Sequence, residues 1–161
     1  MQLPTRYIGW TLVVLLIMIP FVSAESDELF LGQKGQNVSI MNGEITLSTE
    51  IFVDDTIHFF HATLYSGLTI YFFIVKDQKG NFRAAANACQ LCYPAQEGFH
   101  QEKDLIICNV CGNSYPLNKI ATGKGNCNPV PISEQLEVRD GKIILFQNDL
   151  ENLMLFFKAD Q

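Results

Sequence analysis

The chain has 161 residues, a formal net charge of −6 at pH 7 and an isoelectric point near 4.9. This length suits one ordinary domain with an additional N-terminal segment, and the 48% of hydrophobic residues suffices for a packed core. The acidic balance, without any run of Lys and Arg, excludes nucleic acid as a partner.

Residues 1–24 are typical of a targeting segment. Arg6 is the only charge, and a mostly apolar run over 8–22 is followed by small residues directly before Glu25. This pattern predicts a cleaved secretory signal peptide. The alternative is an uncleaved single membrane anchor, for which the run is short because a spanning helix needs about 20 residues. In both cases we expect the remaining chain outside the cytoplasm, in the periplasm or at the cell surface. If the segment stays uncleaved, it attaches the chain to the membrane.

Residues 25–35 are polar and predict a linker, and residues 36–161 predict one mainly β domain with metal-binding turns. Near the start of the domain, apolar and polar residues alternate on both sides of Asn42-Gly43. This dipeptide is typical of a two-residue hairpin turn. The flanking segments, 38–40 and 45–47, are therefore expected to pair as a hairpin.

Further strands are predicted over 51–53, 56–65 and 68–75. The last of these is a near-continuous aromatic and β-branched run, which indicates a buried central strand and not a helix. A turn is expected over 77–80. The segment 82–86 is then expected to be a short strand that leads to the first cysteine.

All five cysteines of the chain lie in one window. Two CxxC pairs, Cys89 with Cys92 and Cys108 with Cys111, are separated by fifteen residues, and Cys127 follows them. Two thiolates separated by two residues can turn toward one point, so two such pairs supply four sulfurs in a roughly tetrahedral arrangement. That geometry suits Zn²⁺, a single iron ion or an iron–sulfur cluster.

Structural disulfides are the main alternative to a metal. An exported chain meets an oxidising environment, although five cysteines would leave one thiol unpaired. A thioredoxin-like redox dithiol would need one CxxC at the start of a helix after a strand. Covalent haem attachment would need His directly after CxxC, where this chain has Tyr93 and Gly112.

Residues around the cysteines are candidates for supporting the site. Gly112 is expected to adopt a positive φ, which lets backbone N–H groups point at sulfur and stabilise the thiolate charge. Tyr93 and Tyr115 each follow a CxxC pair and are expected either to shield a metal from water or to be ordinary packing residues. A loop followed by a short strand over 104–107 is expected to carry Cys108 into the second pair.

The three histidines are weaker candidates. His58 and His61 are three residues apart in a predicted strand, so they are expected on opposite faces and not on one metal ion. We interpret them as solvated or hydrogen-bonded surface residues. His100 lies between the two CxxC pairs and is a candidate ligand or hydrogen-bond donor to sulfur, although four thiolates already fill a tetrahedral shell.

The C-terminal part predicts a second hairpin and a short helix. The hairpin is expected over 136–146, with its turn at Asp140-Gly141. A helix is expected over 149–158, capped by Asp149. Its apolar face would contain Leu150, Leu153, Met154 and Phe157.

The order of the motifs between residues 56 and 144 is distinctive. They are LTIYFFIV at 68–75, a glycine at 80, RAAANACQLCY at 83–93, GFHQ at 98–101, CNVCG at 108–112 and GNCNP at 125–129. This set resembles the FtrD-like family, which comprises membrane-associated proteins described as iron–sulfur-containing and linked to ferrous iron transport. Many members carry several membrane helices, whereas this chain has only the N-terminal segment.

The resemblance implies that the four paired cysteines, Cys89, Cys92, Cys108 and Cys111, are metal ligands. It adds Cys127 as a fifth sulfur, which would replace one of the four, bridge to a second metal or stay free. Two positions depart from the family. Asn87 stands where Asp is usual before the first Ala-Cys, and the two adjacent glycines that usually precede Cys-Asn-Pro are replaced by Gly125-Asn126.

Three functions are open from the sequence. The first is a non-enzymatic electron carrier, whose iron or iron–sulfur centre exchanges electrons with components of an iron-uptake system. The second is a zinc-stabilised binding module, since zinc has no redox chemistry. The third is a carrier that delivers iron or copper to a permease, and a free Cys127 would suit such transfer. No Ser/His/Asp grouping, phosphate loop or paired-carboxylate motif predicts a hydrolase or a kinase.

Overall fold

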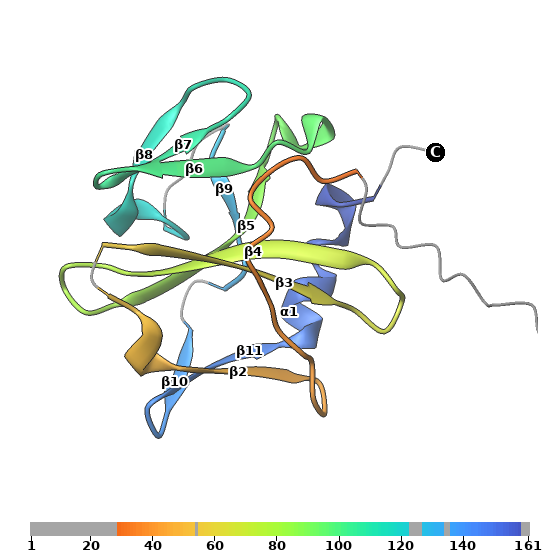
Figure 1. The fold of residues 1–161 in the computed structure, drawn as a ribbon, viewed down its shortest axis with the longest axis vertical. Helices are drawn as coiled ribbons and strands as arrows, with labels where there is room; N and C mark the ends of the chain where they lie inside the picture. The colour runs from red at the N-terminus through yellow and green to blue at the C-terminus, as the bar shows by residue number, and fades with distance from the viewer. Residues whose placement is uncertain (1–28, 54, 123–126, 134–135, 159–161) are drawn as a thin grey trace, which may run out of the picture.

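The computed structural model describes residues 29–53, 55–122, 127–133 and 136–158 (Figure 1). The described part of the chain is mainly β, as predicted. Its strands are β1 (Gln36–Asn37), β2 (Glu44–Ser48), β3 (Ile57–Thr63), β4 (Thr69–Lys76), β5 (Phe82–Cys89), β6 (Phe99–Glu102), β7 (Leu105–Cys108), β8 (Ser114–Pro116), β9 (Pro129–Pro131), β10 (Glu137–Arg139) and β11 (Lys142–Phe146).

These strands form three sheets. A five-stranded sheet in the order β1-β3-β4-β5-β9 crosses the middle of the molecule in Figure 1. The sheet β10-β11-β2 lies on one side of it, and the sheet β6-β7-β8 lies on the other. β1 runs parallel to β3, whereas the pairs β3–β4, β4–β5 and β5–β9 are antiparallel.

Two apolar cores lie on the two faces of the five-stranded sheet. The larger core joins this sheet to β10-β11-β2 and includes Phe72 and Ile143. The smaller core joins it to β6-β7-β8 and includes Phe99. We call the smaller one the cysteine-side core, because Cys89 and Cys108 belong to it.

β4 is the central strand, and from Phe72 to Val75 its side chains alternate between the two cores. Ile70, Phe72 and Ile74 belong to the larger core, and Phe73 and Val75 belong to the cysteine-side core. None of these five side chains has any exposed surface. Because both faces of the strand are covered, its sequence is apolar without interruption. The prediction of a buried central strand over 68–75 is confirmed.

β5 touches both cores and carries the first cysteine. It ends at Cys89 and so extends beyond the strand predicted over 82–86. Ala84 and Ala86 belong to the larger core, Ala85 belongs to the cysteine-side core, and all three are fully buried. Their small volume leaves room for the aromatic side chains that β4 places in the same cores.

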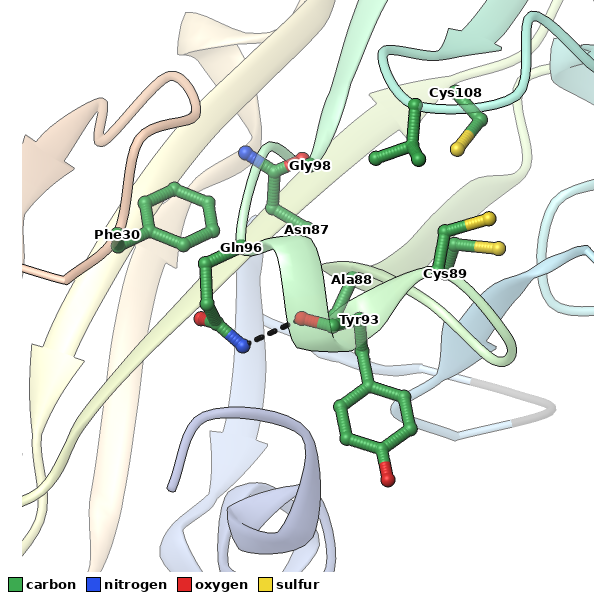
Figure 2. A pocket seen from close by; sticks show the side chains of 10 residues that line it. Phe30, Asn87, Ala88, Cys89, Tyr93, Gln96, Gly98 and Cys108 are labelled. Atoms are coloured by element: carbon green, nitrogen blue, oxygen red, sulfur yellow. Dashed lines mark hydrogen bonds between the residues drawn. The ribbon is translucent and has the colours of Figure 1, made fainter. Parts of the chain in front are cut away.

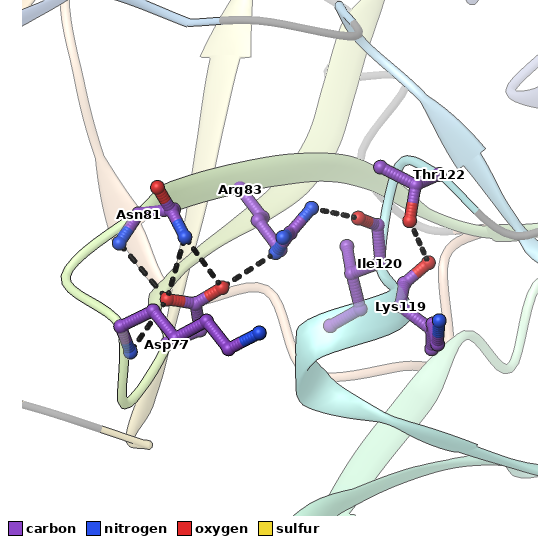
Figure 3. Close-up of polar contacts among 7 residues, drawn as sticks. Asp77, Asn81, Arg83, Lys119, Ile120 and Thr122 are labelled. Atoms are coloured by element: carbon purple, nitrogen blue, oxygen red, sulfur yellow. Dashed lines mark hydrogen bonds and ion pairs between the residues drawn. The ribbon is translucent and has the colours of Figure 1, made fainter.

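The turn between β4 and β5 is held by a buried carboxylate (Figure 3). Gly80 has a φ of +81°, and its N–H donates to the Asp77 carbonyl at 2.8 Å, which confirms the turn predicted here. Asp77 Oδ1 accepts from the Asn81 N–H at 2.9 Å, and Asp77 Oδ2 accepts from Arg83 Nε at 3.0 Å. Arg83 Nη1 also donates to the Ile120 carbonyl at 3.3 Å. Arg83 therefore connects the turn to Ile120, which follows the 3₁₀ helix Leu117–Lys119.

The hairpin expected around Asn42-Gly43 is only partly formed. Both residues have positive φ, and Met41 pairs with Glu44 across them, so the turn is present. Beyond the turn, β2 pairs with β11 and not with residues 38–40. The prediction of a local hairpin is therefore wrong. Pairing with β11 places the inward side chains of β2 in the larger core. A hairpin with residues 38–40 would not have paired β2 with β11.

The C-terminal hairpin is confirmed, and the terminal helix is shorter than predicted. β10 and β11 are antiparallel around Asp140-Gly141, which both have positive φ. A helix α1 (Gln147–Glu151) follows, and then a 3₁₀ helix (Met154–Phe156), in place of one helix over 149–158. Asp149 lies in the first turn of α1 and does not cap it. The predicted apolar positions Leu150, Leu153 and Phe157 are nevertheless buried in the larger core.

Two further segments differ from prediction. Over 51–53, where a strand was expected, the structure has a 3₁₀ helix at Thr49–Ile51 that begins after Ser48. The Ser48 hydroxyl accepts from the Glu50 N–H at 3.3 Å and so satisfies the start of this turn. The loop expected before 104–107 contains β6, which pairs with β7 along its whole length.

The targeting segment predicted over 1–24 lies outside the described residues. Part of the predicted linker is described and packs on the domain: Phe30 is 5% exposed and stacks on Tyr71, with 3.9 Å between ring centroids. Its neighbour Leu31 donates its N–H to the Gln96 carbonyl at 2.9 Å. Across the described ranges, no helix has both the length and the hydropathy needed to cross a membrane.

Candidate metal centre

The ends of three strands deliver the cysteines to one edge of the cysteine-side core. Cys89 is the last residue of β5, and Cys108 is the last residue of β7. Cys92 directly precedes a 3₁₀ helix (Tyr93–Ala95), and Cys111 follows in the turn after β7. Cys127 lies just before β9, whose Pro129 is the register partner of Cys89.

The five sulfurs form two overlapping groups of three. In the first sulfur set, the Sγ atoms of Cys89, Cys92 and Cys127 all lie within 4.8 Å of one another. In the second sulfur set, the same holds for Cys92, Cys108 and Cys111. Cys92 belongs to both sets. All five cysteines are free thiols, so the structure does not contain the disulfides considered as the alternative.

The site extends from the core to the surface. Cys89 and Cys108 are 2% and 1% exposed, Cys92 and Cys127 are half-buried, and Cys111 is exposed. The two buried cysteines anchor the sulfurs in the packed core. The exposed one places the outer edge of the site in contact with solvent.

The second CxxC pair has the backbone geometry expected of a metal-binding turn. Gly112 has a φ of +70°, and a Cβ at this position would meet no atom within 4 Å, so the backbone conformation alone requires glycine. The Gly112 N–H donates to the Cys108 carbonyl at 3.0 Å, and the Cys108 N–H donates to the Asn113 carbonyl at 2.9 Å. These bonds fold the segment back on itself and confirm the positive φ predicted for Gly112.

Backbone N–H groups in this turn point at the sulfurs. A hydrogen bond from the Asn113 N–H lowers the pKa of Cys111 and outweighs the effect of burial. Burial raises the pKa of Cys108, although the N–H groups of Cys111 and Val110 act in the opposite direction. Such donors stabilise a thiolate, which is the form that binds a metal.

Crowding of the sulfurs disfavours several thiolates together. Burial, and then hydrogen bonds with Cys111 and Cys89, raises the pKa of Cys92, the sulfur shared by the two sets. Burial also raises the pKa of Cys127, although a hydrogen bond from the Asn113 side chain lowers it in part. A bound cation would reverse this balance, because metal binding displaces the thiol protons.

The two tyrosines have different surroundings. Tyr115, in β8, packs against the cysteine-side core beside Cys127. Burial, with a further contribution from the charge of Cys127, raises the pKa of Tyr115 to about 12. The ring of Tyr93 packs edge-on against Phe156, with 5.2 Å between centroids, and extends away from the Cys89 sulfur in Figure 2. Of the two predicted shielding residues, the structure therefore brings only the Tyr115 ring to the sulfurs.

The histidines lie outside the two sulfur sets. His100 Nδ1 bonds to the side-chain oxygen of Asn109, a residue inside the second CxxC pair. His58 packs edge-on against Phe52 with 5.1 Å between centroids, and His61 Nδ1 contacts the Lys34 carbonyl at 3.2 Å. His58 and His61 are three residues apart in β3 and therefore lie on opposite faces of the sheet, as predicted.

Asn87 is a supporting residue whose role the sequence did not predict. It lies two residues before Cys89, is fully buried and borders a small pocket together with Cys89 and Cys92 (Figure 2). Its Nδ2 donates to the Gln33 carbonyl at 2.9 Å, and its Oδ1 accepts from the Phe99 N–H at 2.8 Å. A polar residue in the apolar run of β5 is the signal that marks such a role, because a buried amide must find partners.

The donor set fits a thiophilic metal. All candidate ligands are sulfur, and soft thiolates select zinc, copper(I) or iron in iron–sulfur centres over magnesium or calcium. The four paired cysteines do not lie together within 4.8 Å of one another; instead, Cys127 joins Cys89 and Cys92. The arrangement can therefore hold a metal through either sulfur set, with chemistry that depends on the ion.

Comparison with known proteins identified a family. Neither the curated proteins nor the solved structures gave a significant match to the chain. The family model described as "Membrane iron-sulfur containing protein FtrD-like" matches residues 52–157, which is more than half of the chain and includes all five cysteines. The chain therefore belongs to the FtrD-like family of membrane iron–sulfur-containing proteins.

Proposed function

We propose that this protein is a non-enzymatic electron carrier with a cysteine-bound iron centre, acting in ferrous iron transport outside the cytoplasm. The observation that carries the proposal is the gathering of five free thiols from three segments of the chain into two overlapping sulfur sets. The family description supports iron–sulfur chemistry at these sulfurs. The centre is iron bound by cysteine alone or an iron–sulfur cluster.

The position of the sulfurs supports electron exchange with another protein. Electron transfer needs a redox centre close to a surface, and Cys111 is exposed. Each CxxC pair also presents a large apolar side chain to solvent: Leu91 is 59% exposed and Val110 is 44% exposed. Exposed apolar side chains beside a functional site are typical of a contact surface. We therefore propose that a component of the iron-uptake system, or its permease, docks over these two turns.

A zinc-stabilised binding module is the second candidate. It is favoured by the burial of Cys89 and Cys108 in the cysteine-side core, where a metal would connect β5, β7 and the segment before β9. Zinc at such a site contributes to folding and has no redox activity. The copper or iron carrier has less support, because the free Cys127 on which it depended lies in contact range of Cys89 and Cys92.

Elemental analysis and a redox titration of protein purified from its own host test the proposal. We expect iron, with visible absorption that bleaches on reduction and returns on oxidation. A colourless protein that contains only zinc would contradict electron transfer and support the binding module. Iron that does not change its oxidation state at any accessible potential would also contradict it.

A pair of surface variants tests the docking surface. Val110→Ser removes an apolar side chain beside the sulfurs, and Val138→Ser removes one of similar exposure, 49%, in β10. We expect the first variant to slow oxidation or reduction of the centre by host membranes, with unchanged metal content, and the second to have no effect. Equal rates in both variants would contradict a partner contact at the second CxxC pair.

A further inference from the structure

We propose that Cys92 is a bridging ligand and that the five cysteines hold two adjacent metal ions. One ion would be bound by the first sulfur set, Cys89, Cys92 and Cys127. The other would be bound by the second, Cys92, Cys108 and Cys111. The inference rests on the proposed metal binding through cysteine, and it is independent of electron transfer.

The sulfur positions favour two centres over one. Sulfurs bound to one tetrahedral ion at about 2.3 Å lie about 3.8 Å apart. Each set of three is already within 4.8 Å, so a small contraction around an ion brings it to that spacing. Cys89 and Cys108, in contrast, are never members of one set. A single ion bound by the two CxxC pairs would have to draw these two buried residues together.

The number of donors leads to the same arrangement. One tetrahedral ion uses four thiolates and leaves a fifth, yet none of the five sulfurs stands apart from both sets. Five thiolates also carry five negative charges. One divalent ion held by four thiolates has a net charge of −2 and leaves the fifth cysteine a neutral thiol, whereas two divalent ions reduce the net charge of all five thiolates to −1, and buried charge without compensation is costly. With one thiolate shared, each ion has three sulfur ligands and one further position.

Cys92 is the residue placed for sharing. It precedes the 3₁₀ helix Tyr93–Ala95, and its side chain makes no capping hydrogen bond there. It is half-buried between the core cysteines and the exposed Cys111. A thiolate sulfur has more than one lone pair and can bind two thiophilic ions at once. Bridging to a second metal was one of the three roles that the sequence left open for Cys127, but Cys127 belongs to the first sulfur set only.

Cadmium NMR of the full-length chain tests this assignment. Cadmium is a thiophilic, redox-silent probe, and ¹¹³Cd reports each bound ion separately. The reduced protein, loaded with an excess of ¹¹³Cd²⁺ under anaerobic conditions, is expected to bind two ions and give two thiolate resonances. In a proton–cadmium correlation, the β protons of Cys92 should couple to both resonances, and those of each other cysteine to one.

The outcomes separate this inference from the proposed function. One bound ion, two ions with no shared cysteine, or a shared cysteine other than Cys92 would each overturn the bridge and leave metal binding intact. No bound cadmium would overturn both. We further expect Cys92→Ser to reduce the content from two ions to one or none. Cys127→Ser is the matched control, which should retain the resonance of the second sulfur set. A coupled pair of ions in Cys92→Ser would contradict the proposal.

Discussion

The side-chain oxygen of Asn87 accepts a hydrogen bond from the backbone N–H of Phe99 at 2.8 Å. Asn87 lies two residues before Cys89 on β5, and Phe99 is the register partner of Cys108 in the β6–β7 pair. One buried hydrogen bond therefore connects the strand that carries the first CxxC pair to the strands that carry the second. The Nδ2 of the same side chain donates a hydrogen bond to the backbone carbonyl of Gln33.

Asn87→Ala is expected to loosen the metal centre as well as the fold. It leaves the buried N–H of Phe99 without a partner, which costs about 1–3 kcal/mol of stability. Because the two CxxC pairs lose a direct connection, the affinity for metal should fall too. Denaturant unfolding and competition with a metal chelator measure the two effects. Asn148→Ala, at an exposed position of α1, is the control. Unchanged metal affinity in Asn87→Ala would show that this bond does not position the sulfurs.

Cys108→Ser is expected to remove the ion of the second sulfur set and the stability that this ion provides. Cys108 is 1% exposed and belongs to the second sulfur set. Because thiolate binding of a metal is coupled to folding, the free energy of unfolding should become less sensitive to chelator than in the wild type. Ala85→Ser places a hydroxyl in the same core without changing a ligand, and it should keep the metal. A full metal complement in Cys108→Ser, measured per chain, would refute this ligand assignment.

The sequence predicted what depends on local pattern. The apolar run of β4, the Asp140-Gly141 turn and the positive φ of Gly112 follow from nearest neighbours and are present. The pairing of β2 with β11 and the membership of Cys92 in both sulfur sets depend on contacts between distant segments. A one-dimensional pattern specifies which face of a strand is apolar but not which strand will cover it. For the same reason, the spacing of the CxxC pairs predicted a sulfur cluster but not its division into two sets.

The buried carboxylate of Asp77 should make stability depend on acid pH. Hydrogen bonds from Asn81, Arg83 and Lys79 outweigh burial and lower its pKa below the ordinary 3.8. The stabilisation is therefore complete above the unfolded pKa and is lost as pH falls through the lower folded value. Asp77→Asn should be less stable at pH 7 by about 1–3 kcal/mol and lose less stability on acidification. Denaturant unfolding between neutral pH and pH 2 measures the stability of each protein and its loss on acidification. If the free energies of unfolding of wild type and Asp77→Asn fell in parallel with pH, Asp77 would not be the source of the acid dependence.

His58 should add a second dependence, at a higher pH. Burial lowers its pKa from 6.5, and its ring packs against Phe52. Below pH 6.5 the unfolded chain takes up a proton that the folded chain resists, so stability falls until the pH reaches the folded pKa. Glutamine does not titrate, so the free energy of unfolding of His58→Gln should rise relative to that of the wild type as the pH falls from 7.5 to about 5. A constant difference in unfolding free energy across this range would contradict the assignment.

Two glycine substitutions separate backbone strain from a collision beside the sulfurs. Gly98 and Gly112 both have positive φ, +61° and +70°, so alanine at either position costs roughly 1–2 kcal/mol in backbone energy. At Gly112 the new Cβ meets open space, whereas at Gly98 it would lie 2.5 Å from the side-chain oxygen of Asn87. That contact displaces the amide that bonds to Phe99. Gly98→Ala should therefore lose more stability than Gly112→Ala and also weaken metal binding, as measured by unfolding and chelator competition. Equal losses in the two variants would mean that Asn87 can move without consequence for the site.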